Sequence, residues 1–272
     1  MEIASTIADF RNALKGEIAF VPTMGNLHEG HLALVRIAKG NAPCVAASIF
    51  VNRLQFGAGE DFERYPRTFE QDCEKLEAEG VDVLFAPSEA ELYPVPQQVT
   101  VSLPKIAEEL CGAARPGHFN GMATVVLKLL NIARPAYAVF GRKDYQQLHL
   151  VKQMVSQFNL PTSILEGDTV REKDGLAMSS RNRYLSEIER MEAPRLYHVL
   201  REIAEAIASG NADFHALENR AKADLQGRGW QVDYVEIRHA DTLETPQETD
   251  TRLVALGAAR LGKTRLIDNI CL

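Results

Sequence analysis

The sequence predicts an α/β protein, with a Rossmann-like, doubly wound parallel sheet followed by a second, smaller α+β domain at the C-terminus. Three observations lead to this prediction. Short apolar runs alternate with helical patterns over the first two thirds of the chain, which is the rhythm of βαβ units. Several of these runs end in turns rich in glycine and polar residues. After about Thr169 the rhythm changes, so we predict a first domain over residues 1–168 and a second over 169–272.

The first domain is expected to contain four buried strands, each a short apolar run. These strands cover residues 18–22, 45–51, 81–86 and 136–140. Helical patterns lie between and after them, at residues 31–39, 67–79, 123–132 and 145–158, while residues 1–14 are typical of an amphipathic helix. Gly40 and Gly80 suit helix ends. Ligands of such sheets bind at the carboxyl ends of the strands, so we expect the chemistry in the loops after Val21, Val51 and Phe140.

The second domain begins with helix signals. Ser186 and Glu189 have the spacing of a capping box, and Pro194 suits the start of a further helix. Another helix is expected over residues 214–225, and strands over 231–238 and 264–270. Helices and strands are thus mixed here without the βαβ rhythm.

Composition limits the functional class. The chain has 272 residues, 46% of them apolar, and a net charge of -7, which fits a globular enzyme and argues against nucleic acid or an acidic membrane as a partner. The longest apolar runs are far shorter than a membrane span of roughly 20 residues. The N-terminus does not have the pattern of a signal peptide, and the four cysteines are scattered, so we expect a cytoplasmic protein with reduced thiols.

The first block of residues suited to binding or catalysis runs from Pro22 to His31 and carries the pattern His28-Glu29-Gly30-His31. Histidines three residues apart lie on one face of a helix, beside free N–H groups that attract phosphate. For an isolated pair, a capping histidine and a packed histidine would be the favoured explanation, but the context of this pair in the chain favours phosphate binding. A zinc site is a weaker alternative because no H-E-x-x-H spacing and no third ligand are present.

Three further blocks have polar residues at expected strand ends or in a loop. Asn52 and Gln55 could recognise a ligand with a hydroxyl and a carboxylate, or could simply cap a loop. Lys143 and Asp144 begin a helix, where the lysine could neutralise phosphate and the aspartate could bind ribose or magnesium, or where both could simply be solvated. The fourth block, residues 175–183, carries Met178-Ser179-Ser180-Arg181, whose hydroxyls and guanidinium could clamp phosphate and close over ATP, or could simply belong to a surface loop.

Together these blocks resemble the pantothenate synthetase (pantoate–β-alanine ligase) family, within the nucleotidyltransferases that carry the His-x-Gly-His motif. The resemblance extends to Gly262-Lys263-Thr264-Arg265-Leu266-Ile267-Asp268-Asn269, so it covers nearly the whole chain. It implies ATP-dependent condensation of pantoate with β-alanine to pantothenate, AMP and pyrophosphate through an enzyme-bound pantoyl adenylate. It also implies Mg²⁺ and a cytoplasmic homodimer.

The resemblance also implies roles for individual residues. His31, His28 and Lys143 would be catalytic, and Gln55 and Gln147 would bind pantoate. ATP would be bound by Met24, His28, His31, Gly141, Lys143, Asp144, Met178, Ser179, Ser180 and Arg181. Met24 and Phe140 would pack on the dimethyl group of pantoate, while Asn52 and Tyr65 are further candidates. The ligands of Mg²⁺ stay unassigned, with Asp72 as one candidate.

The chain departs from the family pattern at a few positions. Arg53 stands where proline is usual, Asn26 where a small residue is usual, and Arg142 where glutamate or lysine is frequent. Cys111 and the stretch that includes Asp72 are less acidic than in some relatives. Two other classes share part of the pattern: a nucleotidyltransferase acting on a phosphorylated alcohol or base, and a nucleotide sensor without turnover.

Overall fold

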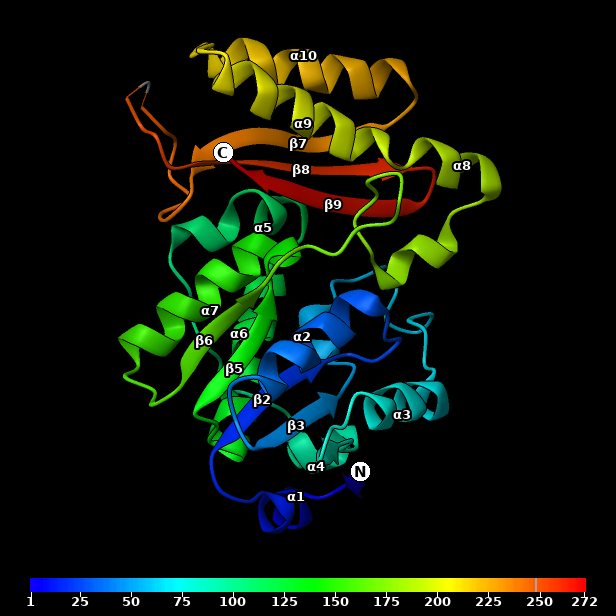
Figure 1. The fold of residues 1–272 in the computed structure, drawn as a ribbon, viewed down its shortest axis with the longest axis vertical. Helices are drawn as coiled ribbons and strands as arrows, with labels where there is room; N and C mark the ends of the chain where they lie inside the picture. Colours follow the sequence, from blue (N-terminus) through cyan, green and yellow to red (C-terminus); the bar gives the residue numbers. More distant parts are fainter. Residues whose placement is uncertain (248) are drawn as a thin grey trace.

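The central element of the computed structural model, which describes residues 1–247 and 249–272, is a parallel sheet of six strands (Figure 1). The strands follow the spatial order β1-β4-β3-β2-β5-β6. Their bounds are β1 (Glu2–Ala4), β2 (Ile18–Thr23), β3 (Cys44–Ile49), β4 (Val83–Phe85), β5 (Tyr137–Gly141) and β6 (Ser163–Gly167). The predicted fold class is therefore confirmed for the first part of the chain.

The order of the strands reverses beside β2. From β2 the chain adds β3 and then β4 on one side, and it later returns to place β5 and β6 on the other side. The carboxyl ends of β2 and β5 therefore flank the topological switch point, where ligands bind in doubly wound sheets. This is the structural reason to look for a site between these two strands.

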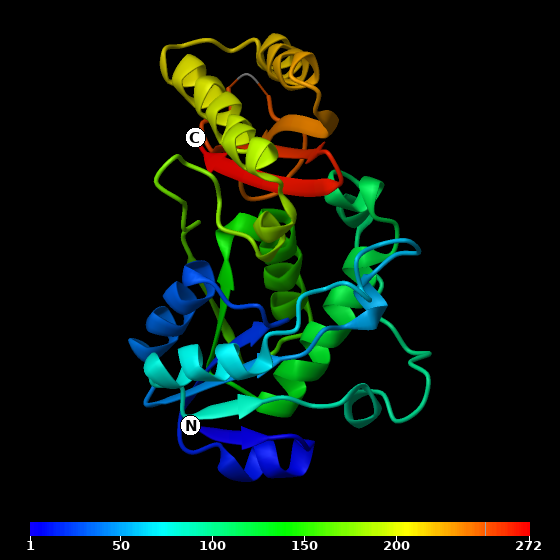
Figure 2. The ribbon, with the colours of Figure 1, turned by 90° about the vertical axis from the view of Figure 1, so that its right-hand side faces the viewer.

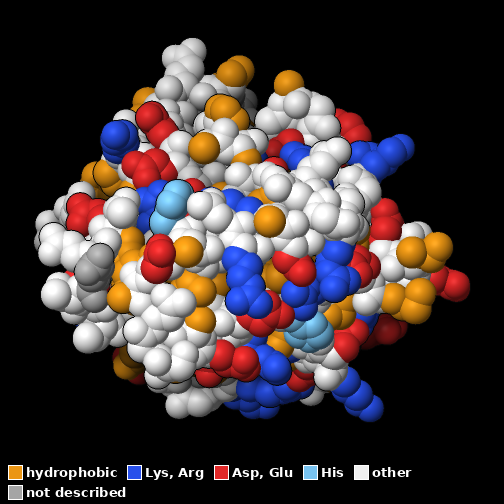
Figure 3. Space-filling view, turned by 90° about the horizontal axis from the view of Figure 1, so that it is seen from above, with side chains coloured by type: hydrophobic (Ala, Val, Ile, Leu, Met, Phe, Trp, Pro, Cys, Tyr) orange, Lys and Arg blue, Asp and Glu red, His pale blue; other side chains and the backbone are white. Residues whose placement is uncertain are grey.

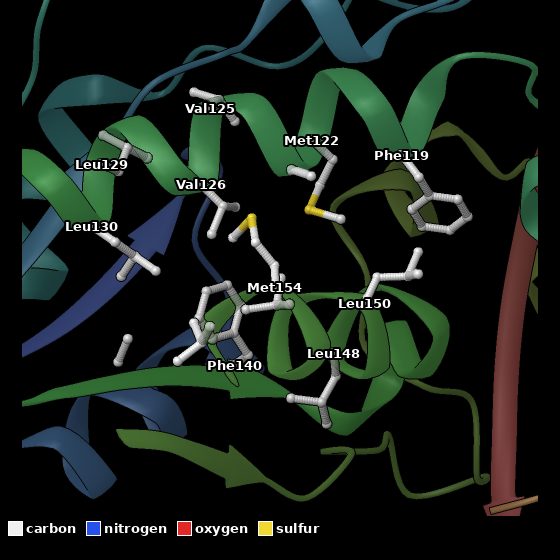
Figure 4. Close-up of a cluster of buried hydrophobic side chains, with 14 of the residues drawn as sticks. Phe119, Met122, Val125, Val126, Leu129, Leu130, Phe140, Leu148, Leu150 and Met154 are labelled. Atoms are coloured by element: carbon white, nitrogen blue, oxygen red, sulfur yellow. The ribbon is translucent and has the colours of Figure 1, made fainter. Parts of the chain in front are cut away.

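Helices cover both faces of this sheet because successive strand residues point to opposite sides. On one face, Phe20 and Phe140 pack with α1 (Ile7–Ala13), α6 (His118–Ala133) and α7 (Tyr145–Gln157). Figure 4 shows Met122 and Val126 of α6 directed toward Phe140 and toward Met154 of α7. The opposite face, with Val21 and Val139, packs against α2 (Glu29–Lys39) and α3 (Phe69–Ala78).

The C-terminal part contains an antiparallel sheet of order β7-β8-β9, covered by two helices (Figure 2). The strands are β7 (Gln231–His239), β8 (Leu253–Leu261) and β9 (Thr264–Cys271), and the helices are α9 (Arg195–Ala208) and α10 (Phe214–Gly227). Ala255 and Ala259 face the core formed with these helices, whereas Leu256 and Ala258 belong to the core of the parallel sheet. Strand β8 is consequently buried on both faces and joins the two halves.

Short elements complete the chain and carry many loop residues. They are η1 (Arg53–Gln55), α4 (Glu89–Leu92), η2 (Lys105–Glu108), α5 (Cys111–Ala114), η3 (Arg142–Asp144), η4 (Ser180–Tyr184) and α8 (Glu187–Glu192). The predicted capping box is confirmed, since Ser186 and Glu189 exchange the two hydrogen bonds at the start of α8. Helix α9 begins directly after Pro194, as expected.

Some element predictions were wrong or incomplete. Residues 1–14 do not form one helix, because residues 2–4 pair with β4 as an edge strand and Thr6 then caps α1 by accepting the N–H of Asp9. Strands β6 and β8 were not predicted. The domain boundary after residue 168 stays a prediction; it falls directly after β6 ends at Gly167.

The surface carries charges of both signs (Figure 3), and the cysteines are unpaired. No helix within the described residues is long and apolar enough to cross a membrane. All four cysteines are free thiols. On the face shown in Figure 3, Lys and Arg side chains are interspersed with Asp and Glu, without one continuous basic field. The absence of a nucleic-acid partner stays a prediction.

Candidate active site

The turn after β2 forms the first part of the site, and hydrogen bonds from the last residue of β2, Thr23, hold it in place. Thr23 Oγ1 donates to the Ser48 carbonyl at 2.7 Å and accepts the N–H of Gly25 at 3.2 Å. Gly25 and Asn26 have φ values of 78° and 51°, in the left-handed region that favours glycine and tolerates asparagine. The chain thereby reverses within a few residues and enters α2, whose N-cap residue is His28.

Asp72 of α3 fixes this turn. Its buried carboxylate accepts the N–H groups of Asn26 and Leu27, both at 2.8 Å, and the hydroxyl of Thr68 at 3.0 Å. Lys75 Nζ donates to the Leu27 carbonyl at 2.7 Å. The carboxylate thus already serves three donors, and a role in Mg²⁺ binding stays a prediction. Within residues 1–247 and 249–272, no three His, Cys, Asp or Glu side chains are grouped as a metal site would need.

The two histidines form a reciprocal cap at the start of α2. His28 Nδ1 accepts the N–H of Gly30 at 3.2 Å, and His31 Nδ1 accepts the N–H of His28 at 3.3 Å. A neutral imidazole that accepts at Nδ1 carries its proton on Nε2. In both rings Nδ1 therefore caps the helix, as the capping interpretation predicts. The Nε2–H groups of both rings are left for a ligand, as the phosphate interpretation requires.

The charge state of these rings follows from their surroundings. Burial lowers the pKa of His28 to about 4, and the nearby Lys143 ammonium contributes. Burial, followed by His28 and Lys143, lowers the pKa of His31 to about 3. Both rings are consequently neutral donors near pH 7, and Lys143 supplies the positive charge beside them.

These lowered pKa values predict a loss of stability in acid. An unfolded histidine titrates near 6.5, so between pH 6.5 and about 4 the unfolded chain binds more protons than the folded chain. The free energy of unfolding must therefore fall as the pH falls through this window. We expect the double variant His28→Asn/His31→Asn to lose less stability than the wild type, by roughly 2 kcal/mol for each histidine, in denaturant titrations at pH 7 and pH 4.5. Equal losses in both proteins would contradict the lowered pKa values.

Gly30 is required between the histidines by their packing. The ring centroids of His28 and His31 are 4.1 Å apart. A Cβ atom at Gly30 would lie 2.9 Å from Cε1 and 3.0 Å from Nδ1 of His28, closer than side chains normally approach. Any larger residue would displace the imidazole, which explains the glycine within the His-x-Gly-His pattern.

A chain of hydrogen bonds orients Gln55, which lies in the short helix after β3. Tyr93 Oη donates to Asn52 Oδ1 at 2.8 Å, and Asn52 Nδ2 donates to Gln55 Oε1 at 3.0 Å. Gln55 Nε2 donates to Met24 Sδ at 3.2 Å. Because Oε1 is occupied, the second Nε2 hydrogen is the part of the Gln55 amide left for a ligand. Gly121 of α6 lacks the side chain that would collide with the backbone of Leu54.

The loop after β5 supplies Lys143. Asn269 Nδ2 of β9 donates to the carbonyls of Arg142 and Lys143, both at 2.9 Å, and so fixes the start of α7. The Lys143 ammonium is 4.0 Å from the Asp144 carboxylate, its one ion-pair partner among the described residues. Gln147 lies one helical turn after Lys143 and lines the same cavity.

The phosphate loop lies across the first turn. Ser180 Oγ donates to the Asn26 carbonyl at 3.1 Å, and Asn26 Nδ2 donates to the Ser180 carbonyl at 3.3 Å. The Arg181 guanidinium makes two bonds of 3.0 Å to the Asp61 carboxylate and lies 5.8 Å from the centre of the Tyr65 ring. Side chains, more than backbone pairing, therefore hold this loop in place.

A cavity of about 230 Å³ at the switch point joins the four blocks. It is lined by every predicted ATP and pantoate residue: Met24, His28, His31, Gln55, Gly141, Lys143, Asp144, Gln147, Met178, Ser179, Ser180 and Arg181. Asn52, Tyr65 and Phe140 line it too, but Asp72 does not. A second cavity of about 430 Å³ shares Lys143, Gln147 and Arg181 with the first and continues toward β8 and β9. Residues far apart in the sequence thus surround one continuous region.

Two members of this region, Arg115 and His118, were not predicted from the sequence. His118 Nδ1 donates to the Gln55 carbonyl at 2.7 Å, and Arg115 Nη1 donates to His118 Nε2 at 2.9 Å. Arg115 also holds Glu60 through bonds of 2.6 and 2.7 Å. Burial, assisted by Arg115, lowers the pKa of His118 to about 4. The sequence Arg115-Pro116-Gly117-His118 places two polar side chains close together and could have marked them as candidates. Their contact with Gln55, however, is formed only in the folded chain.

Comparisons with known proteins agree with this geometry. The family model described as pantoate-beta-alanine ligase matches residues 1–271. The pantothenate synthetase of Chromobacterium violaceum is 60% identical over 273 residues, covering 99% of both chains, and that of Nitrosomonas europaea is 56% identical, covering 100% of this chain and 99% of the relative.

Solved structures are similar along the whole chain. The crystal structure of the Thermus thermophilus pantothenate synthetase has a TM-score of 0.96 and 43% identity, covering 99% of each chain. A Francisella tularensis pantoate-beta-alanine ligase, solved in complex with Beta-gamma ATP and beta-alanine, has a TM-score of 0.82 and 38% identity. That similarity covers 100% of this chain and 97% of the other.

Proposed function

The chain belongs to the pantoate–β-alanine ligase family, and we propose that it condenses pantoate with β-alanine at the expense of ATP, releasing pantothenate, AMP and pyrophosphate. The single observation that carries the proposal is the switch-point cavity, where all four sequence blocks meet. ATP and β-alanine are the ligands named for the Francisella tularensis relative. Pantoate is the third substrate that the family description implies.

In the first step a carboxylate oxygen of pantoate attacks the α-phosphorus of ATP, and the bond to pyrophosphate breaks. The Nε2–H groups of His28 and His31 donate to phosphate oxygens as negative charge develops, and Lys143 neutralises it. Ser179, Ser180 and Arg181 surround the phosphates. To bind phosphate, Arg181 must release its carboxylate partner Asp61. Carboxylate and phosphate both accept two parallel hydrogen bonds from a guanidinium, so the exchange keeps the same geometry. No covalent bond to the protein is needed.

Pantoate lies against the opposite wall of the cavity. The Gln55 and Gln147 amides bind its hydroxyl and carboxylate groups, and Met24 and Phe140 pack on its dimethyl group. The orientation of Gln55 supports this role, because Asn52 occupies Oε1 and Met24 Sδ accepts one Nε2 hydrogen, which leaves the second Nε2 hydrogen for an oxygen. Gly141 and Asp144 bind the nucleotide near its ribose, and Met178 completes the ATP site.

In the second step the β-alanine nitrogen attacks the acyl carbon, the carbon–oxygen bond to AMP breaks, and the amine loses a proton. AMP leaves with the bonding electron pair. The phosphate loop protects the adenylate from water while it awaits the amine. Its contacts with Asn26 and Asp61 support this position over the cavity.

Mg²⁺ bound together with ATP would supply positive charge that neutralises the phosphates. The oxygen donor of Asp144, which lines both cavities beside Lys143, suits this ion. Phosphate oxygens and water would supply most other ligands, in agreement with the lack of an acidic cluster in the described part of the chain. We also assign the protein to the cytoplasm as a homodimer. Its four free thiols support the compartment, and the family resemblance supports the dimer.

The fate of the carboxylate oxygen tests the proposal. With heavy oxygen in the carboxylate of pantoate, attack at the α-phosphorus places one labelled oxygen in AMP and none in pyrophosphate. Mass spectrometry of the products distinguishes this result from attack at the γ-phosphorus, which would give ADP and labelled inorganic phosphate. ADP as the nucleotide product, or a lack of turnover with all three substrates, would overturn the proposed function.

A further inference from the structure

Two arginines face each other across the wall of the larger cavity. Strands β8 and β9 are antiparallel, and Arg260 lies directly opposite Arg265 in their register. The alternation of side chains puts Ala258 with Ile267, and Leu256 with Asn269, on the same face as this pair. The arginines and the flanking Leu256, Ile267 and Asn269 line the cavity of about 430 Å³.

This arrangement leaves positive charge without enough acceptors. Like charges directly opposite each other on neighbouring strands destabilise a sheet. Arg265 Nε donates to Asp233 at 2.7 Å, but its two terminal nitrogens lie 3.6 and 3.7 Å from Cys111 Sγ, a weak acceptor. Arg260 makes no ion pair or side-chain hydrogen bond with the residues that the structure describes. The pair therefore offers open guanidinium donors to an anion in the cavity.

The position of the pair identifies the anion. Lys143 and Gln147 line both cavities, so a ligand between the arginines and this shared wall lies next to the reacting groups. In the proposed function His28, His31 and Ser180 contact the phosphates of ATP from the smaller cavity alone, whereas Lys143, Ser179 and Arg181 contact them from the wall that both cavities share. The carboxylate of β-alanine is the substrate charge to which the proposed function has not yet assigned a protein group.

We infer that Arg260 and Arg265 bind the carboxylate of β-alanine and direct its amine toward the adenylate. This inference rests on the proposed function. A guanidinium fork matches a carboxylate in geometry and charge, and Asp233 holds the Arg265 side chain, which is 13% exposed, ready for it. The product retains the same carboxylate, so the pair also contacts pantothenate before release. The apolar neighbours Leu256 and Ile267 accommodate the methylene groups.

The experiment separates the two half-reactions. Arg260→Met and Arg265→Lys are compared with the wild type for the KM of β-alanine and for exchange of labelled pyrophosphate into ATP with pantoate alone. Loss of charge-assisted hydrogen bonds should raise the KM for β-alanine roughly 10- to 100-fold, while the exchange rate stays unchanged. If Arg265→Lys folds poorly, Arg260→Met alone is sufficient for the test. Arg260 makes no ion pair with the described residues, so its substitution breaks no ion pair within the protein. Arg252→Gln, at an exposed arginine paired with Asp241 before β8, is the control.

A neutral substrate gives a second readout. The wild type should use β-alanine far better than β-alaninamide, which lacks the carboxylate, and Arg260→Met should lose most of this preference. An unchanged preference and an unchanged KM would overturn the inference. Slower pyrophosphate exchange in Arg260→Met would assign the arginines to pyrophosphate instead, which also overturns it. Absence of exchange in the wild type would count against the proposed function, so the two failures are distinguishable.

Discussion

His31→Asn should lower the rate of pyrophosphate release on the order of 100- to 1000-fold, the usual effect of removing one donor aimed at developing charge. The asparagine amide reaches the position of Nδ1 and can still accept the N–H of His28. It does not reach the position of Nε2, so the variant removes the phosphate donor and keeps the helix cap. Rapid-quench measurement of pyrophosphate with ATP and pantoate would show the loss.

His31→Gln provides the matched comparison, because its longer side chain brings an amide N–H near the position of Nε2. We expect it to recover part of the rate while weakening the cap. His215→Asn, at an exposed histidine in the first turn of α10, controls for changes in histidine content. Wild-type pyrophosphate release by folded His31→Asn would show that His31 only caps the helix.

Lys143→Met should reduce adenylate formation by a similar factor, on the order of 100- to 1000-fold. The methionine keeps the apolar stem but removes the ammonium, whose one described ion-pair partner is Asp144 at 4.0 Å. A charge that acts mainly in the transition state lowers kcat and kcat/KM together. Single-turnover rates with saturating ATP and pantoate would measure this directly.

Lys152→Met is the control for this variant. Lys152 lies on the same helix α7 and pairs with Glu166 at the surface, outside both cavities. We expect it to retain wild-type rates. A change confined to the KM for ATP in Lys143→Met would mean that the lysine binds the nucleotide in its ground state and does not assist the reaction.

Local patterns predicted strands β2, β3, β4 and β5 of the parallel sheet because these strands are continuous apolar runs between clear helix signals. Strand β8 escaped prediction for the opposite reason. Its Ala255, Gly257, Ala258 and Ala259 are small residues without strand preference, and they form a strand because both faces are covered by the two cores. Strand β1 has three residues, too few for a periodic signal, and it exists through pairing with β4. Tertiary contacts decided both cases.

The site divides in a similar way. Residues that follow strand ends, such as His28 and Lys143, could be predicted because the sheet topology brings those ends together. Arg115 and His118 could not, since they act on Gln55 through contacts across 60 or more positions of the chain. The tautomers of the histidines also required the structure, because the acceptor role of each Nδ1 depends on the backbone of a neighbouring turn.

The anchoring of the β2–α2 turn by Asp72 and Lys75 affects the thermodynamics of nucleotide binding. These side chains order the backbone of Asn26 and Leu27 when the protein folds, before any ligand arrives. Ordering the backbone of one residue costs about 1–2 kcal/mol of conformational entropy, and at this turn the cost arises when the chain folds and not when a ligand binds. In the proposed function, ATP would therefore meet one preorganised wall at this turn, and the side-chain contacts of residues 175–183 would rearrange on binding. The same turn would present an adenylate-like inhibitor with a rigid surface, so rigid compounds should suit this half of the site.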